Sequence, residues 1–128
     1  MTKRVSTAGL SPADKSAVHR VLTAEHEGTM DQIAALTRDW EGLVQSSVGV
    51  TVDDEHDPEG ATLAFERSQL DGLLLRARGH LDDLDRALER LDEGSYGVCE
   101  ECKRPIAPER LAARPAATTC IRCAARRR

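Results

Sequence analysis

The sequence is short of aromatic side chains and contains no long apolar segment. Of its 128 residues, only Trp40, Phe65 and Tyr96 are aromatic, whereas 31% of the residues are charged. This composition argues against a thick globular core and favours an elongated molecule. No apolar run reaches the roughly eighteen residues that a membrane-spanning helix needs, so we expect no membrane contact of that kind.

The N-terminus also lacks the apolar segment that a secretion signal requires. Residues 1–10 mix small, polar and basic side chains without a period, which predicts a flexible leader. Because no export signal is present, we expect the cysteines to stay reduced and the protein to be cytoplasmic.

Cysteine is confined to one stretch near the C-terminus. Two pairs, each with two residues between its cysteines, are separated by seventeen residues: Cys99, Cys102, Cys120 and Cys123. A structural zinc site takes four such ligands at tetrahedral corners, and this spacing lets one tight turn present both sulfurs of a pair. The pattern therefore predicts one structural Zn²⁺. Disulfides, a redox pair and ordinary buried thiols are the alternatives, and the first two fit a reduced protein with two matched pairs poorly.

The cysteine region is predicted to form a zinc-finger domain over residues 95–123, followed by a basic tail at 124–128. Gly94 and Gly97 precede the first pair and can supply the sharp turns that ligand loops need. We expect the metal to supply most of the folding energy, because few apolar residues are available for a core. They are Val98, Ile106, Leu111 and Ile121.

Proline is absent between Pro12 and Pro58, and two helical patterns fill the chain on either side of Pro58. Ser11 is placed to cap the first helix, and Gly94 to end the second. Steps of three and four residues select Leu22, His26, Thr29, Ile33, Leu36, Trp40, Leu43, Ser47 and Val50, then Leu63, Arg67, Leu70, Leu74, Ala77, Leu81, Leu84, Leu88 and Leu91.

These two patterns predict helices at about 12–47 and 58–93, each about 50 Å long at the helical rise. Because the lengths and seams match and the connection is short, we expect an antiparallel coiled-coil hairpin over residues 11–94. The predicted fold class is therefore mainly α, with a long helical hairpin and a small C-terminal four-cysteine zinc finger.

The predicted connection, at about residues 48–60, is acidic and has no lysine or arginine between residues 50 and 60. Its carboxylates, called the acidic tip below, are Asp53, Asp54, Glu55, Asp57 and Glu59. Most acidic loops are solvated connections without a further role, and that interpretation stays open for this one.

The C-terminal region has the opposite charge. Residues 103–128 hold eight basic side chains and a single acid, Glu109. The basic residues, called the basic foot below, are Lys103, Arg104, Arg110, Arg114, Arg122, Arg126, Arg127 and Arg128. Separated charges of opposite sign can orient a molecule in the field of a partner.

One extended motif runs from Tyr96 to Cys123. It reads Tyr96-Gly97-x-Cys99-x-x-Cys102, then Arg110-Leu111-x-Ala113-Arg114-Pro115-x-Ala117-x-x-Cys120-Ile121-x-Cys123. This motif resembles the zinc finger of the DksA/TraR family of bacterial transcription regulators. The resemblance extends more weakly over residues 11–123, with Asp57-Pro58 at the place of the family's tip motif.

The resemblance implies a regulator that binds RNA polymerase directly rather than promoter DNA. In the family, the hairpin enters the secondary channel, and its acidic tip approaches the catalytic magnesium and destabilises some initiation complexes. The family's second tip aspartate and its alanine are replaced here by Gly60 and Thr62, so only Asp57 of the acidic pair carries over. The chain ends five residues after Cys123, and the resemblance therefore supports the family's ppGpp contact less strongly.

Two other functions remain as alternatives. A nucleic-acid-binding zinc protein could use the basic foot on phosphates, although the foot lacks aromatic stacking residues and a long recognition helix. A thiol sensor could release zinc on oxidation. We do not expect an enzyme, because a zinc ion with four cysteine ligands has no open position and no nucleophile and base are paired at informative spacing.

Overall fold

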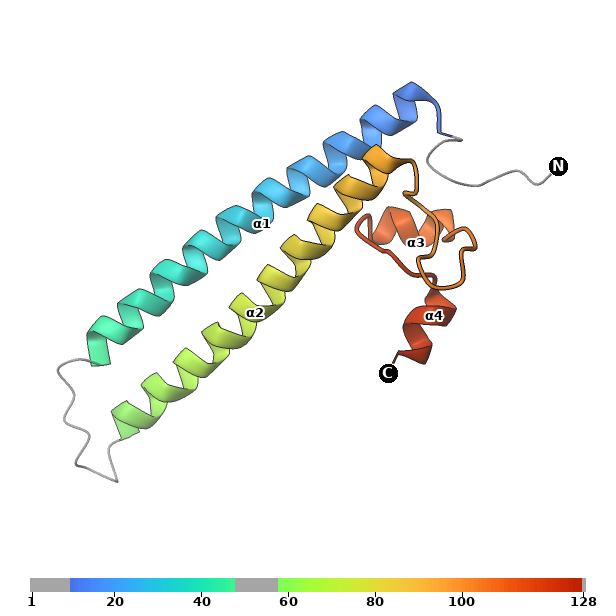
Figure 1. The fold of residues 1–128 in the computed structure, drawn as a ribbon. Helices are drawn as coiled ribbons and strands as arrows, with labels where there is room; N and C mark the ends of the chain where they lie inside the picture. Colours follow the sequence, from blue (N-terminus) through green and yellow to red (C-terminus); the bar gives the residue numbers. More distant parts are fainter. Residues whose placement is uncertain (1–9, 48–57, 128) are drawn as a thin grey trace. The chain divides into compact units, whose positions relative to one another are not determined.

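The computed structural model describes residues 10–47 and 58–127. Its elements, in order, are α1 (Pro12–Ser47), α2 (Pro58–Glu93), α3 (Pro108–Ala113) and α4 (Ile121–Arg126) (Figure 1). Across the described ranges, strand pairing is limited to one isolated bridge between Val98 and Pro105. None of the described helices combines the length and apolar character needed to cross a membrane. The mainly α fold with two long helices is therefore confirmed.

The ends of the long helices follow from residues that the sequence places there. Ser11 caps α1, since its Oγ accepts a hydrogen bond from the backbone N–H of Asp14 at 3.0 Å. Gly94 ends α2 with a φ of +84°, a conformation that glycine adopts without steric cost. The backbone N–H groups of Ser95 and Tyr96 then return to the carbonyl of Arg90, at 2.8 and 3.1 Å.

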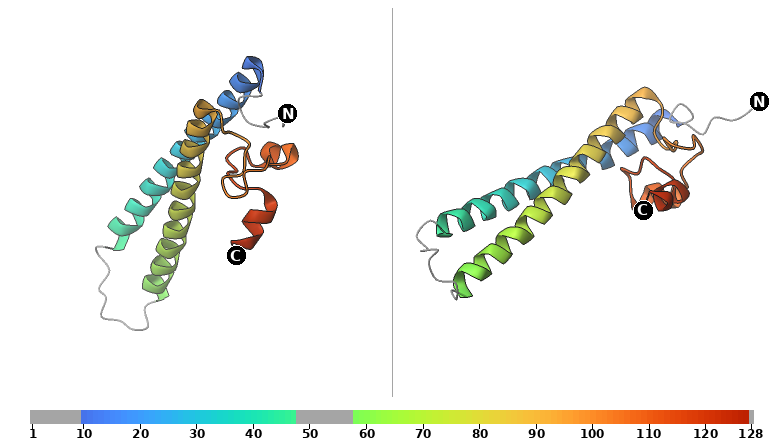
Figure 2. Two further views of the ribbon diagram at one scale, coloured as in Figure 1. Left: turned by 45° about the vertical axis from the view of Figure 1, so that its right-hand side comes forward. Right: turned by 60° about the horizontal axis from the view of Figure 1, so that its bottom comes forward.

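The chain divides into two compact units, which we describe separately. Unit 1 joins the residues up to Glu27 to those from His80 onward, and unit 2 is Gly28–Gly79. Within each unit, a segment of α1 lies beside a segment of α2 that runs in the opposite direction (Figure 1 and Figure 2). The predicted antiparallel pairing of the helices is therefore confirmed within each unit.

Unit 1 contains the densest apolar packing among the described residues. Leu22 of α1 and Leu84 of α2 are completely buried, and both belong to the predicted seams. Three further residues complete the buried cluster: Ala87, Leu91 and Tyr96. Leu111 and Ala116 of the C-terminal region pack against it, so this core includes residues from outside the hairpin.

Unit 2 has a thinner seam. Its buried residues are Thr29, Leu74 and Ala77, and most other seam positions are only half-buried. Arg67, the polar member of the second seam, is exposed and holds its guanidinium 5.8 Å from the centre of the Trp40 ring. The predicted seam is therefore present, but it buries less apolar surface in this unit.

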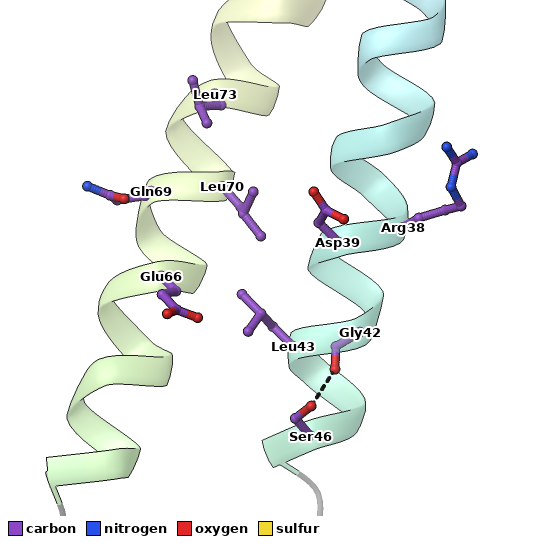
Figure 3. A pocket seen from close by; sticks show the side chains of 9 residues that line it. All are labelled: Arg38, Asp39, Gly42, Leu43, Ser46, Glu66, Gln69, Leu70 and Leu73. Atoms are coloured by element: carbon purple, nitrogen blue, oxygen red, sulfur yellow. Dashed lines mark hydrogen bonds between the residues drawn. The ribbon is translucent and has the colours of Figure 1, made fainter.

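A groove lies beside the seam of unit 2 (Figure 3). Leu43 and Leu70 point toward one another between the two helices, and the groove beside them has a volume of about 540 Å³. Gly42 contributes no side chain to this groove, and a Cβ added there would meet nothing within 4 Å. The Ser46 hydroxyl turns back to donate to the Gly42 carbonyl at 2.9 Å. Small residues on α1 therefore leave this space open.

Candidate metal centre

The first cysteine pair lies on a tight turn. Gly97 enters this turn with a φ of +85°, and its carbonyl accepts from the N–H of Ile106 at 2.8 Å. The N–H of Lys103 donates to the Cys99 carbonyl at 2.9 Å, which brings the chain back just after Cys102. Lys103 itself has a φ of 63°, a left-handed conformation that is uncommon outside glycine. Sequence reasoning had anticipated the glycine turn but not the strained lysine.

The second pair lies at the start of a helix. Cys120 is the N-cap residue of α4, and Cys123 is in the first turn and fully buried. The N–H of Ala124 donates to the Cys120 carbonyl at 2.9 Å. A hydrogen bond of 2.9 Å from the Glu100 N–H to the Thr118 carbonyl joins the loops that carry the two pairs. The four cysteines are thus brought together by backbone contacts as well as by their spacing.

The sulfur positions fit a tetrahedral zinc site. All four Sγ atoms lie within 4.8 Å of one another, and the Sγ atoms of Cys102 and Cys120 are 3.8 Å apart. Zinc–sulfur bonds of about 2.3 Å at tetrahedral angles require neighbouring sulfurs about 3.8 Å apart. The donor set is therefore that of a closed structural site, which offers substrate no free coordination position.

The thiols have opposed tendencies to ionise. Burial raises the pKa of Cys99, but N–H groups of Cys102, Cys120 and Glu101 outweigh that effect and lower it to about 6. The N–H of Cys123 is the main cause of the lowered pKa of Cys120. Arg126 acts to lower the pKa of Cys123, yet burial and the neighbouring thiols raise it to about 11. A bound divalent cation removes this conflict, because it stabilises all four thiolates together.

Unit 1 also links α2 to the zinc finger through polar contacts that sequence reasoning missed. Arg86 forms a short ion pair with Glu100, next to the first cysteine pair. The Arg90 guanidinium donates to the carbonyls of Ser95, at 2.9 Å, and of Val98. The sequence feature that could have predicted these contacts is the position of the two arginines near the end of α2. Basic side chains at that end of a helix can reach its last carbonyl groups and the residues that follow.

Two of these links shift pKa values. Burial raises the pKa of the Glu100 carboxyl, but the hydrogen bond and charge of Arg86 outweigh burial, so the net pKa is lowered. The Tyr96 hydroxyl donates to the Pro115 carbonyl at 2.8 Å. Burial, together with the negative charge of Glu25, raises the pKa of Tyr96. Tyr96 thus remains a neutral donor that ties the end of α2 to the loop before α4.

The predicted core of the zinc finger is only partly correct. Ile106 is buried at 2% exposure, and Val98 and Leu111 are half-buried. Ile121, however, is 70% exposed, so its assignment to the core was wrong. The physical reason is that α4 turns the sulfur of Cys123 inward, and a residue two positions earlier on the same short helix faces elsewhere.

The basic foot contains arginines of two kinds. Three use their side chains within the fold: Arg110 donates to the Thr119 carbonyl at 2.9 Å, Arg126 to the Cys123 sulfur at 3.4 Å, and Arg127 to Glu101 at 2.9 Å. Lys103 also donates to the Glu100 carbonyl at 2.9 Å.

Another three arginines of the foot are uncommitted. Within residues 10–47 and 58–127, no hydrogen-bond or ion-pair partner is found for the exposed guanidinium groups of Arg104, Arg114 and Arg122. Arg128 lies outside the described residues. The foot therefore presents unpaired cations as well as arginines that stabilise the zinc finger.

Most of the predicted acidic tip cannot be placed. Asp53, Asp54, Glu55 and Asp57 lie outside the described residues, and so does the predicted cap made by Asp57. Glu59 lies in the first turn of α2 and is exposed. A carboxylate at that position is favourable to the helix start, whatever else it does. The grouping of the five acids stays a prediction.

Comparison with known proteins identifies the zinc finger. Residues 94–128 match the family model described as the prokaryotic dksA/traR C4-type zinc finger. Uncharacterized protein YteA of Bacillus subtilis is 41% identical over 66 residues, which are 52% of this chain and 28% of YteA. The RNA polymerase-binding transcription factor DksA of Caulobacter vibrioides is 48% identical over 46 residues, 36% of this chain and 32% of that protein. Each match spans under a third of the relative's length.

The structural likeness extends further along the chain. The structure of transcription factor DksA2 from Pseudomonas aeruginosa aligns with a TM-score of 0.72 and 27% sequence identity. The alignment covers 94% of this chain and 92% of that one. With the four clustered cysteines, the zinc-finger match makes a structural Zn²⁺ the cofactor of this domain. Residues 94–128 thus form a zinc finger of the DksA/TraR type, and the fold of the chain is similar to that of DksA2 over nearly its whole length.

Proposed function

We propose that this protein is a non-enzymatic regulator of transcription initiation that binds RNA polymerase directly. In this proposal, the helical hairpin enters the secondary channel of the polymerase and carries the acidic tip toward the catalytic magnesium. The observation that carries the proposal is the likeness to the structure of DksA2, a transcription factor, over 94% of the chain. The DksA relative from Caulobacter is named for its binding to RNA polymerase, which gives the proposed partner.

The contacts within unit 1 support a hairpin that is held firmly at its zinc-bearing end. The metal site, the Arg86–Glu100 ion pair and the Tyr96–Pro115 hydrogen bond all connect α2 to the finger or to its loops. A probe that must deliver charge to a defined place needs such a fixed base, because a loose base spreads the position of the far end.

The acids of the tip supply the proposed chemistry. Asp57 is the acid that matches the family's tip motif, and four further carboxylates lie within six residues of it. Magnesium prefers oxygen ligands, and carboxylates close to a bound divalent cation change its coordination and its field. We therefore attribute the effect on initiation to the charge of the tip rather than to any bond that it makes or breaks.

Transcription with purified polymerase tests this proposal. The Asp57→Asn variant removes one tip charge and keeps the shape of the side chain, so we expect normal binding to polymerase and a weakened effect on initiation. Asp31→Asn is the matched control, because Asp31 is an exposed aspartate on α1 outside the tip. Binding is measured by competition with the labelled wild-type protein, and initiation by the lifetime of the promoter complex.

An unchanged effect of Asp57→Asn on promoter-complex lifetime would count against a tip mechanism. A loss of both binding and effect in the Asp31→Asn control would show instead that the assay reports general damage. Repeating the assay with and without ppGpp tests the alarmone contact separately from the tip mechanism.

A further inference from the structure

The surface between α3 and α4 is hollow, apolar and bordered by positive charge. A groove of about 1260 Å³ lies there, and its lining also includes Cys102, Cys120 and Cys123 of the metal site. Its apolar lining includes Pro105, Ala107, Ala113, Ile121 and Ala125. Ile121 is the large side chain of this set and is 70% exposed. An exposed isoleucine inside a groove is more informative than a scattered surface residue, because it forms part of a contiguous apolar patch.

The charge around this groove is predominantly positive. Arg104, Arg114 and Arg122 line it, and their guanidinium groups have no partner among the described residues. The single acid that lines it is Glu109. Elsewhere in unit 1, arginines such as Arg86 and Arg127 are paired with glutamates. The groove is therefore a place where cations are left available beside apolar surface.

We propose that the groove between α3 and α4 is a docking surface for an acidic protein segment that inserts an aliphatic side chain against Ile121. The carboxylates of that segment pair with Arg104, Arg114 and Arg122, which can each bind a carboxylate through two hydrogen bonds. Aliphatic contact supplies affinity, and the surrounding charges select the partner and its orientation. This surface shares no residue with the acidic tip, and the proposal does not depend on the secondary-channel contact.

A nucleic acid fits the same surface less well. Residues 103–128 contain no aromatic side chain on which a base could stack. Phosphates would satisfy the arginines but would leave the apolar lining, which includes Ile121, without a complementary partner. Aliphatic and acidic groups presented together by one short segment satisfy both parts of the groove.

Peptide binding to the full-length, zinc-loaded protein tests the proposal. The probe is a fluorescent helical peptide of about sixteen residues, with leucines along one face and glutamates beside them. A scrambled peptide with the same composition and charge is the reference. We expect the ordered peptide to bind at least about tenfold more tightly than the scrambled one, because only the ordered peptide presents its leucines together.

Two charge-matched variants locate the contact. Ile121→Asp is expected to weaken binding of the ordered peptide at least about tenfold, whereas Val21→Asp leaves it unchanged. Val21 is also an exposed aliphatic residue of unit 1, at 51% exposure, but does not line the groove. Because both residues are exposed, both variants should retain zinc and helicity, and measurements of metal content and circular dichroism check this.

Four results of the binding experiments would overturn the proposal. They are failure of both peptides to bind, equal binding of the scrambled peptide, equal binding to Ile121→Asp, and displacement of the peptide by a DNA duplex of the same charge. An Ile121-dependent dimer in sedimentation would also overturn it, since the groove would then be an interface between copies of this chain. Tighter binding of the ordered peptide that is lost only in Ile121→Asp supports it.

Discussion

The two compact units are stabilised by different kinds of contact. Unit 1 combines a metal site, an ion pair and a completely buried leucine pair, Leu22 and Leu84. Unit 2 depends on a seam whose buried members are Thr29, Leu74 and Ala77. The comparison shows that one chain can fix its zinc-bearing unit by specific links, whereas the packing of the other unit depends mainly on a periodic seam. Each unit should therefore respond to a different kind of perturbation.

Removal of zinc should produce the largest difference in stability between the two units. Structural zinc contributes on the order of 10 kcal/mol to small metal-bound domains, so a chelator should unfold residues 95–127. We expect amide protection to be lost there and to persist in Gly28–Gly79, which contains none of the four cysteines. Hydrogen exchange with and without chelator measures both regions. Simultaneous loss of protection in both units would show that the hairpin also depends on the metal.

Shortening one leucine in each unit compares their apolar cores. Leu84 has no exposed surface, and we expect Leu84→Ala to lower the free energy of unfolding by about 2–5 kcal/mol. Leu74→Ala in unit 2 should cost less, because its seam neighbours are mostly half-buried and can close the cavity more easily. Urea denaturation gives both values. The comparison fails if Leu74→Ala proves the more damaging change.

Replacement of a glycine by alanine should change the stability of the protein in opposite directions in the two units. In unit 2, Gly42→Ala adds a Cβ that meets nothing within 4 Å, and improved helix propensity should stabilise the protein by about 1 kcal/mol. In unit 1, Gly97→Ala should destabilise it, because Gly97 has a φ of +85°, a backbone conformation that is strained for a residue with a Cβ. Thermal unfolding of both variants checks the signs. Stabilisation by Gly97→Ala would contradict the described turn.

The smallest expected effect is the pH dependence of the Arg86–Glu100 pair. Since the net pKa of Glu100 is lowered in the folded state, its contribution to stability is present above the unfolded pKa. That contribution is lost as the pH falls through the lower, folded pKa. The two side chains are 49% and 19% exposed, so we expect less than about 1 kcal/mol.

Comparison of the wild type with Glu100→Gln measures this contribution. The wild type should be more stable at neutral pH, and the difference should shrink as the solution is acidified. Comparing the two proteins at each pH separates this effect from protonation of the cysteines, which both share. A difference that grows in acid would mean that Glu100 is not stabilised as a carboxylate.

The long helices were predictable because their signals are local. Ser11 and Gly94 mark ends that the structure confirms, and the three-and-four periodicity selected leucines that are buried, such as Leu84. The metal site was predictable for the same reason, since its ligands come in two pairs of fixed spacing. In both cases the residues that meet a chemical requirement lie close together in the sequence, so their spacing alone reveals it.

Other features could not be predicted because they depend on how separate segments meet. The apolar character of Ile121 predicts a core position, yet Ile121 faces away from the side of α4 that buries Cys123. The Arg86–Glu100 pair joins residues fourteen positions apart across a turn, a distance with no periodic signal. The sequence does not distinguish the unpaired arginines of the basic foot from the paired ones, because that distinction depends on the partners that the fold brings to Arg110 and Arg127.

A site-specific cross-link from position 57 tests the central claim most directly. A short photo-reactive probe is placed there in the zinc-loaded protein, and its complex with purified RNA polymerase is irradiated. The account predicts cross-links to polymerase residues around the catalytic magnesium, and competition by unlabelled wild-type protein. Cross-links confined to the outer surface of the polymerase, or to promoter DNA, would contradict it.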